Sequence, residues 1–221
     1  MTRWFYLAVA VTVAAFGASL YVYFFEYARL PEQIPIHWGI DGSPDKWVNK
    51  QDAWINFWLV PALMAGFLLL TLVLPWLSPR PFEVDRFRDT YGYVMAMVIV
   101  LFGFIHFLIL WASLQPSFDM ARRMVAGIMF FFALIGNVMG RVRRNFWMGV
   151  RTPWTLASET VWNETHRLAA WLYTAFGIVG CIAVLLGAPL VWCFVIFMIV
   201  AVFPVFYSLV LYKRLERQGR L

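Results

Sequence analysis

Charged residues are scarce in this sequence. Asp, Glu, Lys and Arg make up 14% of its 221 residues, whereas an average soluble domain carries about 25%. Hydrophobic residues make up 62%, and the mean hydropathy is +0.72. This composition excludes a soluble enzyme and a nucleic-acid-binding domain. The net charge of +6 does not indicate a nucleic-acid partner either, because the basic residues lie between apolar runs rather than on one water-facing patch.

The long apolar runs contain no Asp or Glu, and the whole chain contains only two cysteines, Cys181 and Cys193. Without intramembrane carboxylates, a proton-coupled transporter built on a carboxylate relay is disfavoured. The cysteines lack the spacing of a metal site, so we expect them to pack as small apolar residues. The runs also lack a paired Ser, His and Asp set and a His-Glu-x-x-His motif. We therefore expect no catalytic residues, no cofactor and no metal.

Uncharged runs long enough to cross a bilayer are abundant. A hydrocarbon core about 30 Å thick needs roughly 20 apolar residues in a helix. The uncharged runs cover residues 4–25, 53–79, 90–118, 124–140 and 168–212. The last would be roughly 67 Å long as one helix, so it must fold back, and we place the turn at Gly187, Ala188 and Pro189. The sequence thus predicts an all-α polytopic membrane protein with six transmembrane helices, the first a retained anchor rather than a signal peptide.

Lys and Arg are distributed unevenly between the connecting segments. If the N-terminus is inside, the inner segments hold 13 of the 18 basic residues and the outer segments hold 5. Cytoplasmic segments of membrane proteins carry the excess of Lys and Arg. We therefore expect both termini on the cytoplasmic side, an N-in/C-in topology.

Two connections are much longer than the others. The outer one covers residues 26–52 and the inner one residues 141–167, with 27 residues each, and binding sites concentrate on such loops. We divide the chain accordingly into an N-terminal membrane module, residues 1–90, and a C-terminal membrane domain, residues 91–221. In each half the long connection follows the first of three spans. This suggests the hypothesis of a 3+3 inverted repeat, which would favour a transporter of peptide or lipid.

The outer connection has the composition of an ordered, extended loop, because its prolines exclude a continuous helix. His37 with Asp41 and Asp45 could hold zinc or act as a general base, but a single His beside turn-forming Asp residues favours a rigid turn. A calcium loop is disfavoured because Lys46 stands where glycine is needed.

The inner connection begins with Arg141, Arg143 and Arg144, which can pair with anionic lipids. Further along, we expect Thr155 to cap a helix that carries Glu159 in its first turn, where a carboxylate suits the helix dipole.

That helix should continue through Trp162 and His166, which lie four residues apart and share a face. Arg151 could clamp a carboxylate or the carbonyl groups that end the fourth span. Within the spans, we expect a neutral His106 bonded to a backbone carbonyl or to Asn137.

Both long connections resemble known families. The run LPEQIPIHW at residues 30–38, followed by Asp41-Gly42 and Lys50, resembles a module of unknown function that commonly precedes SdpI domains. The run NFWMGVRTPWTL at residues 145–156, followed by ETVW at 159–162 and THR at 165–167, is similar to the signature of the SdpI family itself.

The resemblance implies a non-catalytic protein of the bacterial cytoplasmic membrane that protects its producer from a secreted antimicrobial peptide toxin. It also implies, for some members, capture of a cytosolic ArsR-type transcriptional repressor. The toxin-binding candidates would then be Pro35, His37, Trp38, Asp41, Asp45 and Trp47. The signalling candidates on the inner face would be Asn145, Gly149, Arg151, Thr152, Pro153, Trp154, Trp162 and His166. The alternatives are a peptide or lipid transporter and, less favoured, a membrane metalloenzyme that uses His37, His106 or His166.

Overall fold

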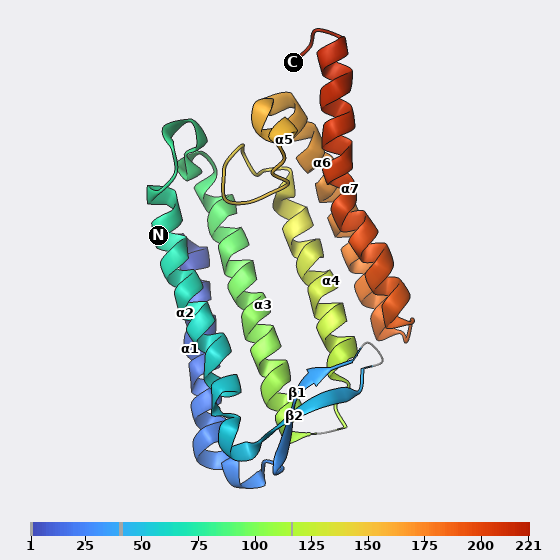
Figure 1. Cartoon of the computed structure of the whole chain (residues 1–221). Helices are drawn as coiled ribbons and strands as arrows, with labels where there is room; N and C mark the ends of the chain where they lie inside the picture. Colours follow the sequence, from blue (N-terminus) through green and yellow to red (C-terminus); the bar gives the residue numbers. More distant parts are fainter. Residues whose placement is uncertain (1, 40–41, 116) are drawn as a thin grey trace.

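Six long helices form one bundle (Figure 1). The computed structural model describes residues 2–39, 42–115 and 117–221, and for residues 56 and 81 it describes the backbone alone. The long helices are α1 (Arg3–Tyr21), α2 (Trp54–Trp76), α3 (Arg88–Leu114), α4 (Met120–Met139), α6 (Glu159–Leu185) and α7 (Leu190–Arg217). All six, with the short helical turns that extend three of them, are long and apolar enough to cross a membrane, which confirms the predicted six spans.

The smaller elements lie in the connections. Strands β1 (Gln33–Trp38) and β2 (Pro44–Asn49) form an antiparallel hairpin, and α5 (Pro153–Ala157) is a single helical turn. Short turns of π or 3-10 helix cover Val22–Glu26, Tyr27–Arg29, Lys50–Asp52, Arg80–Phe82 and Val84–Phe87. The hairpin is thus the one departure from an all-α fold in the part of the chain that the structure describes.

The long uncharged run of residues 168–212 folds back where its sequence predicts. Helix α6 ends at Leu185, and α7 begins directly after Pro189. The guanidinium of Arg122, on α4, donates to the carbonyl groups of Val184 at 2.6 Å and Ala188 at 3.3 Å. The Val184 carbonyl also accepts from the backbone N–H of Gly187 at 3.1 Å, so the bonds from Arg122 add to the cap of α6 and attach the turn to α4.

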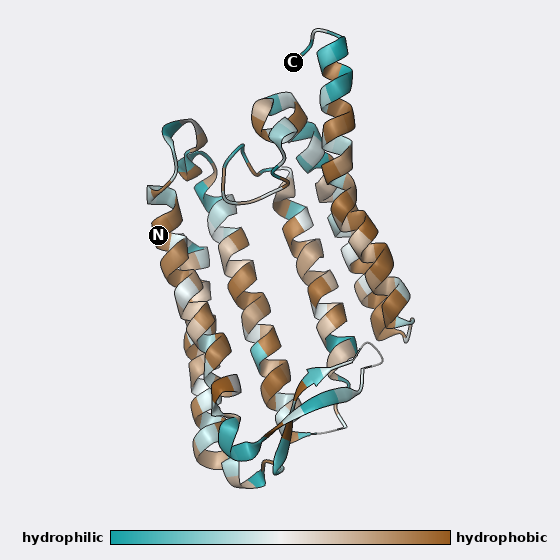
Figure 2. Cartoon of the chain, in the orientation of Figure 1, coloured by the Kyte–Doolittle hydropathy of each residue, from teal (hydrophilic) through white to brown (hydrophobic). Residues whose placement is uncertain are grey.

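The two long connections lie at opposite ends of the bundle (Figure 1). We call these the hairpin end, which carries residues 26–52, and the loop end, which carries residues 141–158. Figure 2 shows hydrophobic residues along the middle of the helices and hydrophilic ones near both ends, as expected for helices with a hydrocarbon environment. The basic residues counted as inner cluster at the loop end. Which end faces the cytoplasm stays a prediction.

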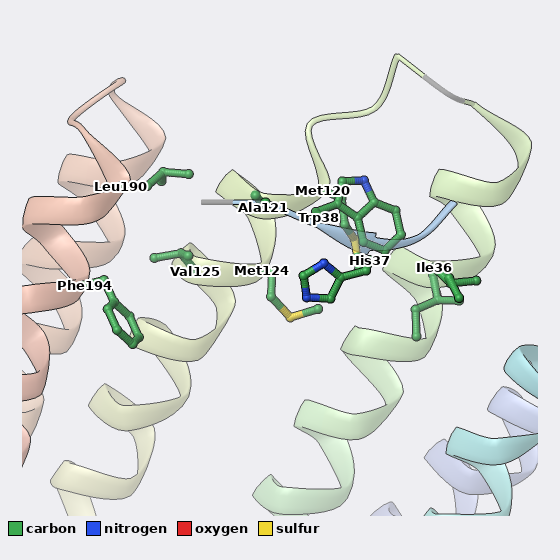
Figure 3. A pocket seen from close by; sticks show the side chains of 11 residues that line it. Ile36, His37, Trp38, Met120, Ala121, Met124, Val125, Leu190 and Phe194 are labelled. Carbon is green, nitrogen blue, oxygen red and sulfur yellow. The ribbon is translucent and has the colours of Figure 1, made fainter. Parts of the chain in front are cut away.

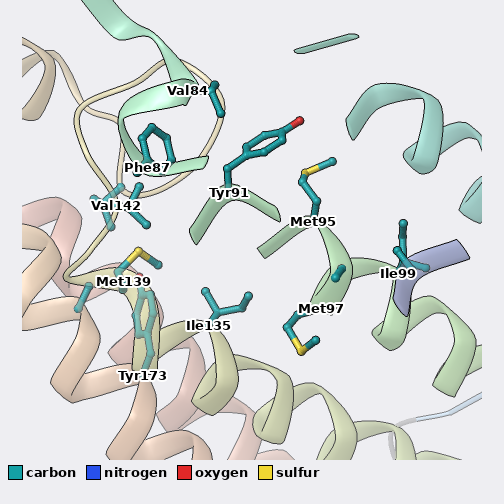
Figure 4. Close-up of a cluster of buried hydrophobic side chains, with 14 of the residues drawn as sticks. Val84, Phe87, Tyr91, Met95, Met97, Ile99, Ile135, Met139, Val142 and Tyr173 are labelled. Carbon is teal, nitrogen blue, oxygen red and sulfur yellow. The ribbon is translucent and has the colours of Figure 1, made fainter. Parts of the chain in front are cut away.

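The bundle consists of two groups of three helices, joined through α3 and α4. Near the loop end this junction is filled by a cluster of buried side chains from both groups, including Phe87, Tyr91, Met139 and Tyr173 (Figure 4). Helix α1 packs mainly on α3, the third helix of its group, whereas α4 packs mainly on α6, the second of its own. The inverted repeat therefore stays a hypothesis, and so does the domain boundary after residue 90, which falls in the first turn of α3.

The contact between α4 and α6 depends on small residues. A Cβ atom added at Gly177 would lie 2.6 Å from the carbonyl oxygen of Met129. Such close backbone approach is typical of membrane helices that associate through glycine. It fixes α6 against α4 and thereby positions the loop that joins them.

The hairpin is anchored on the first three helices by Ile34, whose side chain is fully buried beside Leu30, Phe57 and Leu110. In the ladder Ile34 lies opposite Val48, and irregularities on either side of residue 37 change the register. Bulges of this kind bend a strand and redirect its side chains. The predicted extended conformation is confirmed.

The expected pairing of His106 with Asn137 is wrong, whereas the alternative, a bond to a backbone carbonyl, is confirmed by the carbonyl of Ala15. Asn137 lies on an exposed face of α4, whereas His106 is buried and its Nε2 lies 2.9 Å from the hydroxyl of Ser19 on α1. The Ser19 hydroxyl donates its one hydrogen to the carbonyl of Phe57 at 2.6 Å, so His106 must donate to Ser19 from Nε2. Ser19 and His106 thus join α1 to α3, and the bond to the Phe57 carbonyl adds α2. In the sequence, this contact was indicated only by the single serine in the first span.

Candidate functional site

A pair of polar side chains bridges the two strands of the hairpin. His37 Nδ1 lies 2.6 Å from a carboxylate oxygen of Asp45, with both side chains about half exposed. A carboxylate accepts hydrogen bonds, so the Nδ1–H of His37 donates to Asp45. This pair fixes the orientation of the imidazole.

An apolar cavity of about 470 Å³ lies beneath the hairpin. Strand β1 contributes its last residues, and the other walls come from α3, α4 and α7 (Figure 3). The cavity is lined by Ile36, His37, Trp38, Gly39, Ile109, Met120, Ala121, Met124, Val125, Leu190 and Phe194. The imidazole of His37 is the one ionisable side chain among them.

The structure brings three of the outer candidates together at this cavity. His37 and Trp38 line it, and Asp45 holds His37 from outside. Pro35 and Trp47 lie opposite each other in the ladder and do not line the cavity: Pro35 is buried, and Trp47 is exposed. Asp41 lies outside the described residues.

A metal site finds no support in the described part of the chain, which contains no group of three His, Cys, Asp or Glu side chains able to hold an ion. Lys50, the last residue of the outer motif, has a structural role instead. Its ammonium group donates to the carbonyl of Leu30 at 3.1 Å and lies 4.9 Å from the ring centre of Tyr27.

At the loop end, Asn145 organises the turn that follows α4. Its buried amide nitrogen donates to the carbonyls of Arg143 and Met148, at 2.8 and 3.2 Å. Its amide oxygen accepts from the backbone N–H groups of Trp147 and Met148, at 2.7 and 2.9 Å. One asparagine thus satisfies four backbone groups in a segment without regular secondary structure.

The side chain of His166 holds the next part of the loop. Its Nδ1 donates to the carbonyl of Trp162 at 2.8 Å, and its Nε2 accepts from the backbone N–H of Val150 at 3.0 Å. The ring stacks on Trp162 with 4.0 Å between ring centres, and the indole N–H of Trp162 donates to the Val142 carbonyl at 2.7 Å. The predicted shared face of Trp162 and His166 is confirmed. With both nitrogens of His166 occupied, neither can bind a metal or move a proton without breaking the loop.

Gly149 fits this arrangement for two reasons. Its φ of +100° lies in the left-handed region, and an added Cβ would lie 2.3 Å from Nε2 of His166. Any other residue would meet both backbone strain and a clash with the histidine.

The helix starts differ from the prediction at Thr155. Thr152 caps α5 and forms a reciprocal capping box with Thr155, which is the third residue of that short helix. Ser158 has an extended backbone and caps α6 by accepting from the N–H of Val161. The expectation that Thr155 caps the long helix is therefore wrong, because Ser158 interrupts the helix between α5 and α6. Glu159 does lie in the first turn of α6, as expected.

The predicted clamp by Arg151 is also wrong. Its guanidinium donates to the carbonyl of Phe146 within the same loop, rather than to a carboxylate or to the end of α4. Arg151 and Pro153 are exposed and Trp154 is partly exposed. Of the inner candidates, these three face outward, whereas the others, except the exposed Gly149, are buried parts of the scaffold.

Two contacts attach the loop to helices on either side, and both escaped sequence analysis. The indole N–H of Trp147 donates to the hydroxyl of Ser78, just after α2, at 2.7 Å. The hydroxyls of Thr152 and Ser208, on α7, lie 3.0 Å apart. Ser208 is a lone polar residue in an apolar run, and this was a usable signal because a hydroxyl in hydrocarbon needs a partner.

Comparison with known proteins finds relatives for both long connections. Residues 141–208 match the sequence profile of the SdpI/YfhL protein family, and residues 10–65 match that of a domain of unknown function, DUF1648. The segment at residues 141–208 is thus similar to the SdpI/YfhL family. The chain is also 27% identical to Immunity protein SdpI of Bacillus subtilis (strain 168) over 153 residues, which cover 69% of this chain and 70% of that protein. No solved structure matches the chain.

The SdpI profile covers the loop, α6 and most of α7, whereas the DUF1648 profile covers most of α1, the hairpin and the first half of α2. The resemblance seen in the two sequence motifs is thereby confirmed. With its six apolar helices, the chain is a multi-pass protein of the bacterial cytoplasmic membrane.

Proposed function

We propose that this chain is a non-catalytic immunity protein that protects its producer from a secreted antimicrobial peptide. Its similarity to Immunity protein SdpI of Bacillus subtilis supports an immunity function. The observation that carries the proposal is the apolar cavity under the hairpin, with the oriented His37–Asp45 pair at its edge. N-in/C-in topology is part of the proposal and would place this cavity on the outer side, where a secreted peptide arrives.

A membrane-active peptide has apolar side chains that partition toward hydrocarbon. Placing one large apolar side chain in the cavity would contribute about 1.5–3 kcal/mol relative to water. Nε2 of His37 is the ring nitrogen available for a hydrogen bond with the peptide, because Nδ1 is held by Asp45. Trp38 is partly buried against α3 and α4 and forms part of the cavity wall.

Substitution of His37 or Trp38 tests this site. His37→Ala and Trp38→Ala should each lower survival under the toxin by roughly tenfold or more, since about 1.4 kcal/mol of lost binding corresponds to a factor of ten. Membrane abundance should be unchanged. Trp171→Ala is the matched control, because Trp171 is 75% exposed on α6, away from the cavity. Normal survival of both hairpin variants would refute the site.

We further propose that the loop end can capture a cytosolic repressor of the ArsR type through its exposed residues. Arg151 uses one nitrogen for the Phe146 carbonyl and exposes the rest of its planar fork, which suits a carboxylate on a partner. Arg141 and Arg143 are exposed nearby in the sequence and can instead serve anionic lipids.

A pull-down with an ArsR-type repressor encoded beside this chain would test the capture. Arg151→Lys should weaken recruitment severalfold while immunity persists, because an ammonium cannot reproduce two parallel hydrogen bonds. Arg167→Lys, an exposed arginine that pairs with Glu164 on α6, is the control. Equal recruitment by the two variants would refute the role of Arg151.

A further inference from the structure

A second cavity, of about 860 Å³, lies along α3, α4 and α6, and none of its lining residues lines the first. Its floor is rich in aromatic side chains, including Phe104, Phe107 and Phe130. Phe107 and Phe130 are about half exposed although they belong to spanning helices, so their rings face the hydrocarbon of the membrane. Polar side chains gather only at the hairpin end of the groove.

The charges at that end do not cancel. Asp119 caps α4, and both of its carboxylate oxygens accept bonds from Arg122, at 3.0 and 3.1 Å. Arg123 gives one bond to the carbonyl of Asp119 and lies 4.3 Å from the ring centre of Phe118. Its other guanidinium N–H groups have no partner among the described residues. Among the described residues at this end of the groove, Arg122 therefore neutralises Asp119, and Arg123 leaves one net positive charge.

The length and shape of the groove match an amphiphile. From Arg123 to Phe130 on α4 is seven residues, roughly 10 Å along the helix at about 1.5 Å per residue. A Cβ atom at Gly127, midway between them, would lie 2.1 Å from the ring of Phe104, so the glycine lets that ring lie against α4 and form the floor. An extended hydrocarbon chain would lie along this floor while its anionic end meets Arg123.

We propose that this groove binds a phospholipid, with the phosphate on Arg123 and an acyl chain over Phe107 and Phe130. Charge complementarity favours this occupant. Arg123 places one positive charge in the first turn of α4, and the rest of the groove along the helix is apolar. A lipid phosphate lies at this level of a bilayer and is a strong acceptor for guanidinium N–H groups. The bound lipid would fill the space between α3 and α4 that protein side chains leave open at the hairpin end.

Native mass spectrometry of the purified full-length protein, with phosphatidylglycerol added to the detergent micelle, tests this proposal. The unmodified protein should retain one phosphatidylglycerol. Arg123→Gln should lower the retained fraction about tenfold, as expected for the loss of a charge-assisted hydrogen-bonding group. Arg123→Lys should fall in between. Arg29→Gln removes an equal charge at the hairpin end, from a side chain that pairs with Glu26, and should retain lipid like the unmodified protein.

Cys181 offers a second readout because its thiol lines the groove. In a Cys193→Ser background, added phosphatidylglycerol should slow alkylation of Cys181 by a membrane-permeant maleimide, and Arg123→Gln should remove this protection. Equal lipid retention by Arg123→Gln and Arg29→Gln, or alkylation of Cys181 that ignores the lipid, would overturn the proposal. No toxin is present in either experiment, so the outcome does not depend on the immunity function.

Discussion

The conformation of the loop between α4 and α5 is stabilised by hydrogen bonds from a few side chains more than by apolar contacts. Asn145 and His166 use every polar atom of their side chains on backbone groups. A buried backbone group left without a partner costs about 1–3 kcal/mol, so each bond constrains the residue that makes it. This explains why the loop tolerates burial without a helix or a strand.

Gly149→Ala should destabilise the protein. Forcing a side chain into the left-handed region costs about 1–2 kcal/mol, and displacement of His166 would also weaken its bond to Val150. The thermal unfolding temperature in detergent should fall. Gly17→Ala, on an open face of α1, is the matched control and should leave it unchanged or raise it, because alanine favours helix. If both variants melt alike, the proposed steric role of Gly149 is wrong.

Individual residues were the hardest part to predict from the sequence. The stacked pair Trp162 and His166 followed from helical spacing, because both lie on one regular element. The partner of Arg151 and the Ser19 partner of His106 did not follow, because they depend on how a nonperiodic loop folds and on which face of a neighbouring helix is turned inward. A short-range partner such as Phe146 competes well with a distant carboxylate, since closing a small loop costs little entropy.

At the scale of elements, hydropathy was sufficient to predict the spanning helices but not the shorter elements. The spacing of charges predicted all six spans, because a helix pairs its own backbone N–H and C=O groups within hydrocarbon. Pro189 marked the start of α7. Prolines excluded a continuous helix in residues 26–52 but did not reveal a two-stranded hairpin, whose anchoring through Ile34 depends on contacts with the distant Phe57 and Leu110. The misplaced cap at Thr155 has a similar cause: two capping residues, Thr152 and Ser158, lie close together, and only the fold shows that each begins its own helix.

At the scale of the whole molecule, orientation is the property most open to direct measurement. With Cys181 and Cys193 replaced by serine, Lys46→Cys should react with an impermeant maleimide on intact cells, whereas Arg151→Cys should react only after the membrane is permeabilised. Both positions are exposed in the structure, so access depends on the side of the membrane alone. Labelling of both from outside would refute the proposed topology.

The arrangement of the two helix groups could not be read from the sequence. Hydropathy assigns residues to spans, but within lipid every apolar face is equally acceptable, so packing is decided by small residues and buried polar pairs. Gly177 and the pair of Ser19 with His106 are examples whose partners lie on other helices. For the same reason the cavities at the hairpin end carry no signature in the sequence.

The bonds of Trp147 to Ser78 and of Thr152 to Ser208 fasten helices of both groups to one loop. Relative motion of the two groups would therefore be smallest at that loop and largest at the opposite end of the helices, beneath the strands. If the proposed peptide separates the two helix groups beneath the strands, the groups would rotate slightly about the loop. The orientation of Arg151 would then change more than its position.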